Sequence, residues 1–204
     1  MAYFPVFMDI NDQICLVVGG GTVALRKVEK LQEYGARVRV IAKEILPQIK
    51  ELPGLAWQER TFEETDLTDV VLVVAATDDA AENHRIAECC RTAKVPVNAV
   101  DQIEDCSFLF SSMVRQGDVV AAVSSGGKSP ILTQYLKKKI AQVLTERVGE
   151  ANDLLGEWRP YVKAEFATEA RRKPVFKALF ERCLEGEELP EEQEILRLIA
   201  SFKK

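Results

Sequence analysis

The sequence predicts an α/β protein built on an open, mainly parallel sheet, to which a β-hairpin, a long helix and a helical C-terminal region are appended. Two observations carry this prediction. Apolar runs rich in β-branched residues alternate with stretches of helical spacing as far as about residue 100. One of these runs, 14–18, leads straight into the glycine turn 19–21 and then into a helical pattern, which is the order of a βαβ unit.

The strands are predicted from short apolar runs at residues 3–8, 14–18, 37–42, 70–75 and 95–100. The first helix is predicted over 22–34, and Gly35 is expected to end it. The helical spacing directs one set of its side chains toward the sheet, namely Val23, Val28, Leu31 and Tyr34. It directs another set largely toward solvent, namely Arg26, Lys27, Glu29 and Lys30. A second helix, 80–93, is expected to begin at a capping box of Asp79 and Glu82.

The glycine turn has the pattern of a dinucleotide site in a Rossmann-type sheet. In the pattern GxGxxA, Gly19 permits the tight turn, Gly21 lets backbone amides approach the phosphates, and Ala24 stands where the helix packs on the strand. Gly20 lies between these two glycines and belongs to the same predicted cofactor site. The helix directs its partly positive end and its unpaired N–H groups at the anion. The turn is therefore predicted to bind the pyrophosphate of a nicotinamide dinucleotide.

Polar residues after the next two strands are candidates for the same cofactor. Glu44 stands roughly 20 residues after the turn, where a carboxylate commonly binds the ribose hydroxyls. It favours NAD, whereas the neighbouring Lys43 could pair with the 2′-phosphate of NADP, and a solvated helix start is the alternative for both residues. Thr77 and Asp78 are also predicted to lie at the cofactor, while Asp79 is interpreted as a helix cap.

Asp101 follows the predicted strand 95–100 at the carboxyl edge of the sheet, where open α/β proteins bind their ligands. A carboxylate there can orient a substrate or accept a proton, and a turn-forming aspartate would give the same pattern. Asn98, on the same strand, is a second polar residue that is predicted to bind the substrate.

The second half of the chain changes to antiparallel β structure followed by helices. Residues 108–114 and 119–124 are two β-type runs around the turn-like sequence RQGD. A long helix is predicted from its N-cap Ser129, through Pro130, to Gly149. The regions expected are a nucleotide-binding domain at 1–112, a dimerisation region at 113–149 and a helical region at 150–204. A homodimer is expected because the hairpin and the helix carry more apolar surface than they can bury alone.

A loop of small residues before the long helix resembles an anion-binding nest. Its backbone is expected to bind substrate carboxylates at Ser124, Ser125, Gly126, Gly127 and Lys128. An ATP-binding P-loop is disfavoured, because the pattern GxxxxGK[ST] needs glycine where this chain has Ala122 and because Pro130 offers no N–H.

Composition narrows the function classes. The chain has 204 residues, of which 47% are hydrophobic and 29% charged, as in globular proteins. Its net charge of −5 argues against a general nucleic-acid binder. No apolar segment reaches the roughly 20 residues of a membrane helix, and the N-terminus lacks a secretion signal, so a cytoplasmic protein is expected. The 5 cysteines and the single His84 show no metal-ligand spacing, and His84 is interpreted as a solvated helix residue.

A series of segments resembles the precorrin-2 dehydrogenase family of siroheme biosynthesis. In chain order they are FPVFMDI, CLVVGGGTVALRK, AATDD, NAVD and AAVSSGGKSPIL. Their order and spacing match over roughly residues 3–150, and the charged helical tail fits the family's third region. The chain is similar to the stand-alone dehydrogenase form or to the N-terminal module of siroheme synthase, without the methyltransferase module.

The resemblance implies NAD-dependent oxidation of precorrin-2 to sirohydrochlorin and, as in some members, insertion of ferrous iron by the same protein. It also implies an intertwined homodimer. It makes Asp101 the essential acidic group and puts nucleotide contacts at Thr22, Val23, Lys43 and Glu44. Ser125 corresponds to a serine that is phosphorylated in some relatives.

A tetrapyrrole substrate carries many carboxylates, which need cations and amides. Arg115, Lys128 and the 124–127 loop are expected to provide them. No protein-side metal cage is expected, so that iron would be held largely by the tetrapyrrole. Two alternatives stay open: a non-catalytic, NAD-responsive dimeric sensor, and a dehydrogenase that needs a separate chelatase.

Overall fold

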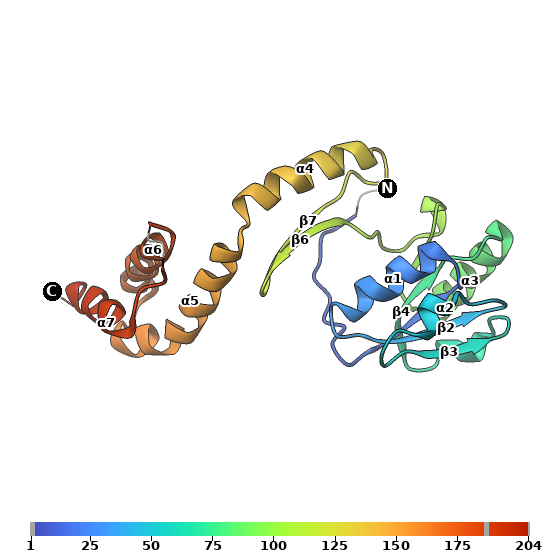
Figure 1. Cartoon of the computed structure of the whole chain (residues 1–204), viewed down its shortest axis with the longest axis horizontal. Helices are drawn as coiled ribbons and strands as arrows, with labels where there is room; N and C mark the ends of the chain where they lie inside the picture. Colours follow the sequence, from blue (N-terminus) through green and yellow to red (C-terminus); the bar gives the residue numbers. More distant parts are fainter. Residues whose placement is uncertain (1–2, 186–187, 204) are drawn as a thin grey trace. The chain divides into compact units, whose positions relative to one another are not determined.

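The computed structural model describes residues 3–185 and 188–203, which form two compact units, Met1–Phe110 and Ser111–Lys204 (Figure 1). The first unit is a five-stranded parallel sheet in the order β3-β2-β1-β4-β5. Its strands are β1 (Ile14–Val18), β2 (Arg37–Ala42), β3 (Ala56–Glu59), β4 (Val70–Ala75) and β5 (Val97–Ala99). Because β1 pairs with both β2 and β4, the strand order reverses beside β1, and the crevice for a ligand opens there. The predicted Rossmann-type sheet is confirmed.

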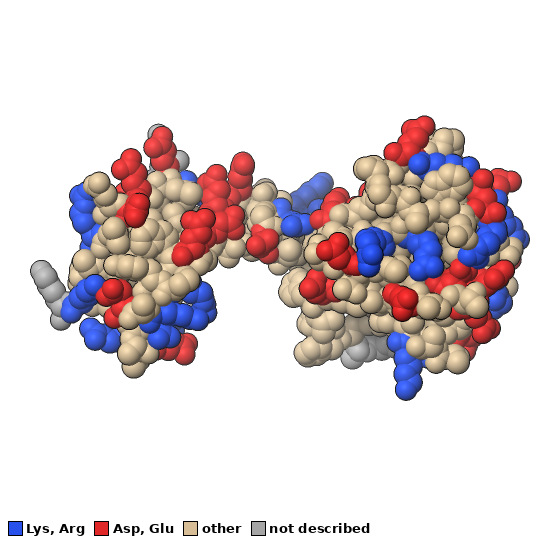
Figure 2. All heavy atoms as spheres, turned by 90° about the horizontal axis from the view of Figure 1, so that it is seen from below, with Lys and Arg blue, Asp and Glu red and all other residues tan. Residues whose placement is uncertain are grey.

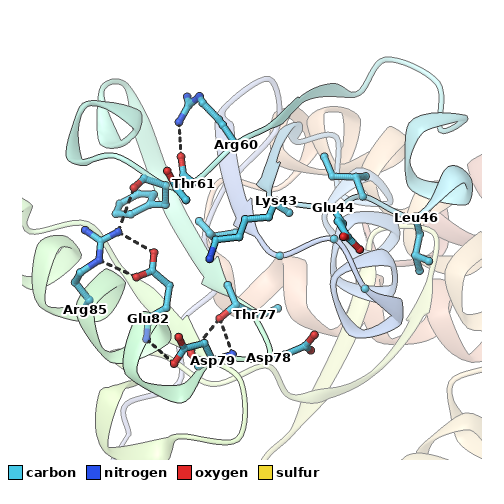
Figure 3. Close-up of a pocket in the computed structure, with 18 of the residues that line it drawn as sticks. Lys43, Glu44, Leu46, Arg60, Thr61, Thr77, Asp78, Asp79, Glu82 and Arg85 are labelled. Carbon is cyan, nitrogen blue, oxygen red and sulfur yellow. Dashed lines mark hydrogen bonds and ion pairs between the residues drawn. The ribbon is translucent and has the colours of Figure 1, made fainter.

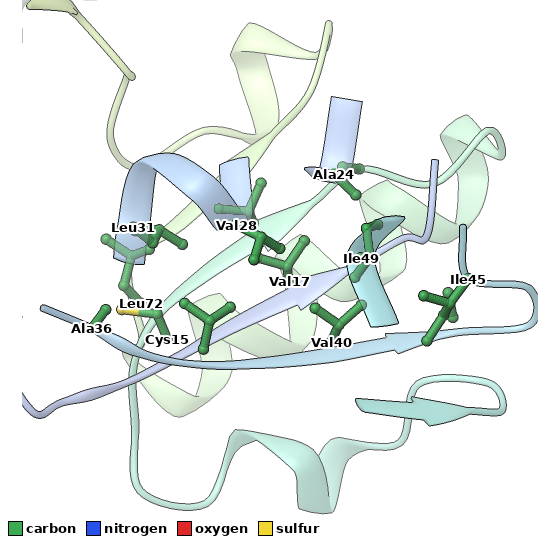
Figure 4. Close-up of a cluster of buried hydrophobic side chains, with 14 residues drawn as sticks. Cys15, Val17, Ala24, Val28, Leu31, Ala36, Val40, Ile45, Ile49 and Leu72 are labelled. Carbon is green, nitrogen blue, oxygen red and sulfur yellow. The ribbon is translucent and has the colours of Figure 1, made fainter. Parts of the chain in front are cut away.

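Helices cover both faces of this sheet. They are α1 (Thr22–Gln32), α2 (Pro47–Lys50) and α3 (Ala80–Ala93), with 3-10 turns η1 (Glu64–Leu67) and η2 (Ile103–Asp105). On one face Val28 and Leu31 of α1 pack with Ile49 of α2 against Val17 and Val40 (Figure 4). Residues of η1 and α3 cover the other face. Alternate residues of β1 enter the two clusters, which is why the sequence of this strand is continuously apolar.

The first helix differs from its prediction in three ways. It ends at Gln32 rather than at residue 34, and Gly35 (φ +77°) then turns the chain, with its N–H 2.9 Å from the Gln32 carbonyl oxygen. The expected burial of Val23 is wrong: this side chain is 41% exposed, and Ala24 occupies the buried position. Lys27, expected in solvent, is half-buried.

One predicted strand is absent, one observed strand was not predicted, and a third is shorter than predicted. Residues 3–8 form no strand, and the apolar side chains there face solvent; Pro5 has no N–H to give to a sheet. The polar, exposed edge strand β3 was missed because its side chains bury no face. Strand β5 spans Val97–Ala99 instead of 95–100, since it starts only after Pro96.

The N-terminus of α3 is capped as predicted by Asp79, whose Oδ1 accepts hydrogen bonds from the N–H groups of Ala81 (2.9 Å) and Glu82 (3.3 Å). In a full capping box the Glu82 carboxylate would accept a hydrogen bond from the backbone N–H of Asp79. Here it instead binds Arg85 on the next turn of the helix. The helix itself has the predicted bounds.

The second unit begins with an antiparallel hairpin of β6 (Ser112–Gln116) and β7 (Val119–Val123), as predicted. Its first strand starts later than residue 108, because Phe108 and Phe110 pack against the core of the first unit. The helices that follow are α4 (Pro130–Val143), α5 (Glu146–Glu165), α6 (Glu169–Glu185) and α7 (Glu192–Ser201). The last three share a core that contains Val162, Phe166 and Leu179.

The predicted long helix is two helices. Ser129 caps the first, with its Oγ accepting from the Leu132 N–H at 3.2 Å. The helix stops at Leu144, whose φ of −85° and ψ of 78° leave the helical region, and α5 starts after Thr145. The break lets α5 pack on the hairpin, where a side chain at Gly149 would come within 3.0 Å of the Gln116 carbonyl.

Both the hairpin and the helices after it belong to the second unit; the boundary at residue 149 and the dimerisation role of 113–149 stay predictions. The described residues contain no helix that is long and apolar enough to span a membrane. All 5 cysteines are free thiols. Burial raises the pKa of Cys15 to about 11, so this thiol stays protonated. On the face of the first unit drawn in Figure 2, charges of both signs are interspersed.

Candidate functional site

The glycine turn after β1 lies in close contact with the residues that follow the neighbouring strands β2 and β4. Gly19 adopts φ +132°, and a Cβ there would lie 2.2 Å from the carbonyl oxygen of Ala76. A Cβ on Gly20 would lie 1.9 Å from the carbonyl oxygen of Glu44. Since both neighbours are backbone atoms that cannot swing away, only glycine fits at these two positions without a shift of the chain.

Gly21 is in a different environment. It is the N-cap residue of α1, and a Cβ built on it would meet nothing within 4 Å. The amides of the first turn of α1 are therefore open to an approaching anion, and no side chain of residues 3–185 or 188–203 caps the helix. Thr22 and Val23 belong to this turn and are exposed. The turn thus leaves the start of α1 open at Gly21, while close backbone contacts at Gly19 and Gly20 fix its shape; phosphate binding there stays a prediction.

A pocket of about 810 Å³ opens beside this turn, at the carboxyl ends of β1, β2 and β4 (Figure 3). Its size lies within the range of cofactor pockets. It brings together the predicted cofactor residues Gly19, Gly20, Gly21, Lys43, Glu44, Thr77 and Asp78. Thr22 and Val23 lie next to it on α1 but do not line it.

Lys43 and Glu44 enter the pocket from the end of β2 in different ways. The Lys43 side chain points into the pocket in Figure 3. The hydrogen bond from Arg85 is the main cause of the lowered pKa of Glu82 on the opposite wall, and the charge of Lys43 adds the smallest contribution in the same direction. Glu44 contributes its backbone, which lies against Gly20, as well as its carboxylate. The lining of the pocket therefore includes both a basic and an acidic residue, and their contacts with a nucleotide stay predictions.

The loop between β4 and α3 is fixed by a buried amide. Asn83 accepts hydrogen bonds at its Oδ1 from the Thr77 N–H (3.0 Å) and the Thr77 hydroxyl (2.8 Å), and its Nδ2 donates to the Thr77 carbonyl oxygen (3.1 Å). Asp78, directly after Thr77, lines the pocket. The position of this wall is therefore set from within the protein rather than by a ligand.

Two arginines line the pocket that sequence reasoning missed. Arg60 Nη1 lies 2.8 Å from Oδ2 of Asp66, a carboxylate only 5% exposed. Burial alone would raise the pKa of Asp66, but the hydrogen bonds from Arg60 and from the Glu63 N–H outweigh it and lower the pKa. Arg85 forms two hydrogen bonds of 2.8 Å with Glu82. Neither arginine belongs to a recognisable sequence motif. Both lie far from the glycine turn in the sequence, and only the fold brings them to the pocket.

Asp101 lies beyond the end of β5 and does not line the pocket. Its φ of +61° is in the left-handed region, and its side chain is exposed. The segment after it is tied to α3: Gln102 Nε2 donates to the Ala80 carbonyl oxygen at 3.0 Å, and Asp105 Oδ1 lies 2.8 Å from His84 Nδ1. His84, interpreted from sequence as merely solvated, therefore has a structural partner.

Asn98, a predicted substrate residue, is buried in β5. Its Nδ2 donates to the Phe108 carbonyl oxygen at 3.0 Å and contacts the Cys106 sulfur at 3.4 Å. These bonds tie the strand to the chain that returns over α1. The side-chain amide of Asn98 thus stabilises the fold, and its contact with a substrate stays a prediction.

The remaining predicted substrate residues belong to the second unit. Arg115 lies in β6, and its Nε donates to the Gly117 carbonyl oxygen at 2.8 Å. In the 124–128 loop, Gly126 and Gly127 have φ of +63° and +81°. The hydroxyl of Ser125 accepts from the Ser129 N–H at 2.9 Å, and that of Ser124 accepts from the Gly126 N–H at 3.1 Å. The loop is thus ordered by its own serines, and its binding of substrate carboxylates at Lys128 and its neighbours stays a prediction.

The described residues contain no group of three or more histidine, cysteine or acidic side chains arranged to hold a metal ion. The parallel sheet, the glycine turn and the pocket beside it define the class of this part of the molecule, which is a dinucleotide-binding α/β domain. The chain belongs to the family described as putative NAD(P)-binding, which it matches over residues 6–112.

The relatives confirm the resemblance that the motifs predicted. The chain is 42% identical over 193 residues to the siroheme synthase of Nitrosospira multiformis, and the match covers 91% of this chain and 40% of that protein. It is 41% identical over 190 residues to the siroheme synthase of Thioalkalivibrio sulfidiphilus, of which it covers 38%. It therefore spans about 40% of the length of these curated relatives.

A solved structure, that of the precorrin-2 dehydrogenase SirC, has the same fold. The two superpose with a TM-score of 0.78 at 24% sequence identity, over 98% of this chain and 100% of the other.

Proposed function

We propose that this protein catalyses the NAD-dependent oxidation of precorrin-2 to sirohydrochlorin, a step of siroheme biosynthesis. One observation carries the proposal: a glycine turn open to a phosphate at Gly21 lies beside an 810 Å³ pocket in a chain 42% identical to a siroheme synthase. The name of the structural neighbour, a precorrin-2 dehydrogenase, supports the same choice of substrate.

The oxidation removes one hydride and one proton from precorrin-2. When bound, NAD supplies the hydride acceptor. The protein must hold the dinucleotide, and the open amides of α1 together with the Thr77 and Asp78 wall fit that task. Asp101 is the proposed proton acceptor. Its exposure leaves it accessible to a large substrate, and the ties from Gln102 and Asp105 to α3 hold its segment in place.

NAD is the proposed dinucleotide, with Glu44 accepting hydrogen bonds from the ribose hydroxyls. NADP is the alternative, because the Lys43 ammonium enters the same pocket and can pair with a 2′-phosphate (Figure 3). Comparing the affinities of the wild-type protein for NAD and for NADP separates the two.

Insertion of ferrous iron into sirohydrochlorin is a second proposed activity, supported by the name of the siroheme synthase relatives. In that step the macrocycle must lose protons, and Asp101 is again the proposed acceptor. We further propose that the chain acts as a homodimer. The exposed apolar residues Ile131, Leu132, Tyr135 and Val143 of α4 support this proposal.

The test is anaerobic incubation of the protein with precorrin-2 and NAD, followed by the absorbance of sirohydrochlorin. Conversion is expected, and it requires NAD. Tight NAD binding without any conversion would instead support the non-catalytic sensor. Adding ferrous iron to sirohydrochlorin with this protein alone distinguishes a bifunctional enzyme from one that needs a separate chelatase.

A further inference from the structure

Lys27 is placed unlike the other cations of α1. Its ammonium nitrogen lies 3.7 Å from the centroid of the Phe110 ring, and the side chain is half-buried. Arg26 beside it is exposed, and Lys30 forms an ion pair with Glu33 on the next turn. In the described part of the chain, no carboxylate lies within ion-pair distance of Lys27. The helix thus holds a partly dehydrated cation that lacks an acidic partner.

Phe110 is a fixed support for this cation. Its ring packs with that of Phe108 at a centroid separation of 5.4 Å, and both rings lie against the core cluster that α1 shares with the sheet. The ring covers one side of the ammonium and attracts it through the negative face of its π-system. Lys27 is therefore held in one place rather than swinging through solvent.

The end of β5 lies on the same side of the sheet as α1, because Val100, which follows β5, packs against the core cluster that contains Val28 and Leu31 of α1. Burial lowers the pKa of Lys27, and the negative charge of Asp101, the residue directly after Val100, opposes this effect. The segment that joins Asp101 to Cys106 is itself fixed, because the Cys106 sulfur contacts the Ala99 carbonyl oxygen at 3.1 Å and Asp105 binds His84. A cation and the proposed proton acceptor are thus presented together from two rigid elements.

We propose that Lys27 is a substrate-binding residue, which pairs with a carboxylate of the tetrapyrrole beside Asp101. This inference rests on the proposed function. An ammonium that the fold has already partly dehydrated loses less on binding than a fully hydrated one, and it gains more from an anion in a less polar setting. The carboxylate of the substrate supplies the partner that the protein omits, and the fixed ion pair orients the reacting carbon toward Asp101.

The test measures two affinities of the full chain under anaerobic conditions. Binding of sirohydrochlorin is followed by the quenching of the protein's tryptophan fluorescence, and binding of NAD is measured separately. Lys27→Met keeps an apolar stem over Phe110 but removes the charge. We expect it to weaken sirohydrochlorin binding about 10- to 100-fold, the loss of one hydrogen bond between charged groups, and to leave NAD binding unchanged. Lys27→Arg is expected to retain most of the affinity.

Arg26→Met is the matched control, because it removes one positive charge from an exposed position on the same helix. It is expected to bind both ligands as the wild type does. Lys27→Gln repeats the test with a polar, uncharged end group, and thermal unfolding checks that each variant is folded. A merely structural Lys27 would change NAD binding and the unfolding midpoint together.

The outcomes separate this inference from the proposed function. Wild-type affinity in both Lys27→Met and Lys27→Gln would overturn the inference while leaving the proposed function intact. Equal losses in Arg26→Met and Lys27→Met would also overturn it, because they would show a general charge effect. A wild-type protein that binds no sirohydrochlorin would overturn the proposed function, and the inference with it.

Discussion

The glycine turn separates the requirements of folding from those of cofactor binding, and matched substitutions at adjacent residues test this separation. In Gly20→Ala, the added Cβ would lie 1.9 Å from the Glu44 carbonyl oxygen and 2.8 Å from the Ile45 Cα. Both are backbone atoms, so the chain after β2 has to move. Overpacking of this kind costs about 1–3 kcal/mol. At about 2–4 °C per kcal/mol for a protein of this size, the unfolding midpoint of the protein is expected to fall by roughly 2–12 °C.

Gly21→Val should give the opposite pattern. Its φ of −88° is ordinary for any residue, and nothing lies within 4 Å of the new Cβ, so the fold is expected to stay close to that of the wild type. The side chain fills the approach to the amides of α1, however. Each hydrogen bond lost from the phosphate costs about 1.5–3 kcal/mol, and NAD affinity should therefore fall at least about tenfold.

Thermal unfolding by circular dichroism and titration calorimetry with NAD measure the two effects independently. The reasoning predicts that Gly20→Ala lowers the midpoint and that Gly21→Val lowers affinity at a nearly unchanged midpoint. It would be refuted by wild-type NAD affinity in Gly21→Val, or by a wild-type midpoint in Gly20→Ala.

Three further predictions concern the rest of the molecule. Asp101→Asn is expected to abolish oxidation of precorrin-2 while NAD binding persists; substantial turnover, measured as NADH formed, would contradict the role of Asp101. Lys43→Ala is expected to weaken NADP more than NAD in parallel calorimetric titrations, and an equal loss for both would remove Lys43 from the 2′ position. The lowered pKa of Asp66 means that its pair with Arg60 stabilises the fold above the ordinary carboxyl pKa of about 4 and is lost as the pH falls below it. Urea unfolding of Asp66→Asn should therefore show a smaller difference between pH 7 and pH 3 than the wild type, and an identical pH dependence would contradict this.

The elements that could be predicted from the sequence are those whose signals are local. The β1 and β4 strands are buried on both faces and have continuous apolar runs, and α3 begins at a side-chain cap. The glycine turn was found for a similar reason. Close backbone approaches at Gly19 and Gly20 leave a mark in the sequence, because no other residue fits there.

Other features depend on contacts that no local pattern records. The edge strand β3 buries no face, and the break at Leu144 accompanies a tertiary contact, the packing of α5 on the hairpin. Arg60 and Arg85 reach the pocket from segments outside the glycine motif. Lys27 was assigned to solvent by helical spacing, but Phe110, far away in the sequence, folds back over it. Tertiary contacts of this kind override the spacing of a single helix.

The central claim is that the pocket at the glycine turn and Asp101 act in one oxidation. The most direct measurement follows NADH and sirohydrochlorin together by absorbance during anaerobic turnover of precorrin-2, in the wild type and in Asp101→Asn. We predict that the wild type forms the two products in equal amounts and that Asp101→Asn, although it binds NAD, forms neither. Sirohydrochlorin formed without NADH, or unimpaired formation of both products by Asp101→Asn, would contradict the claim.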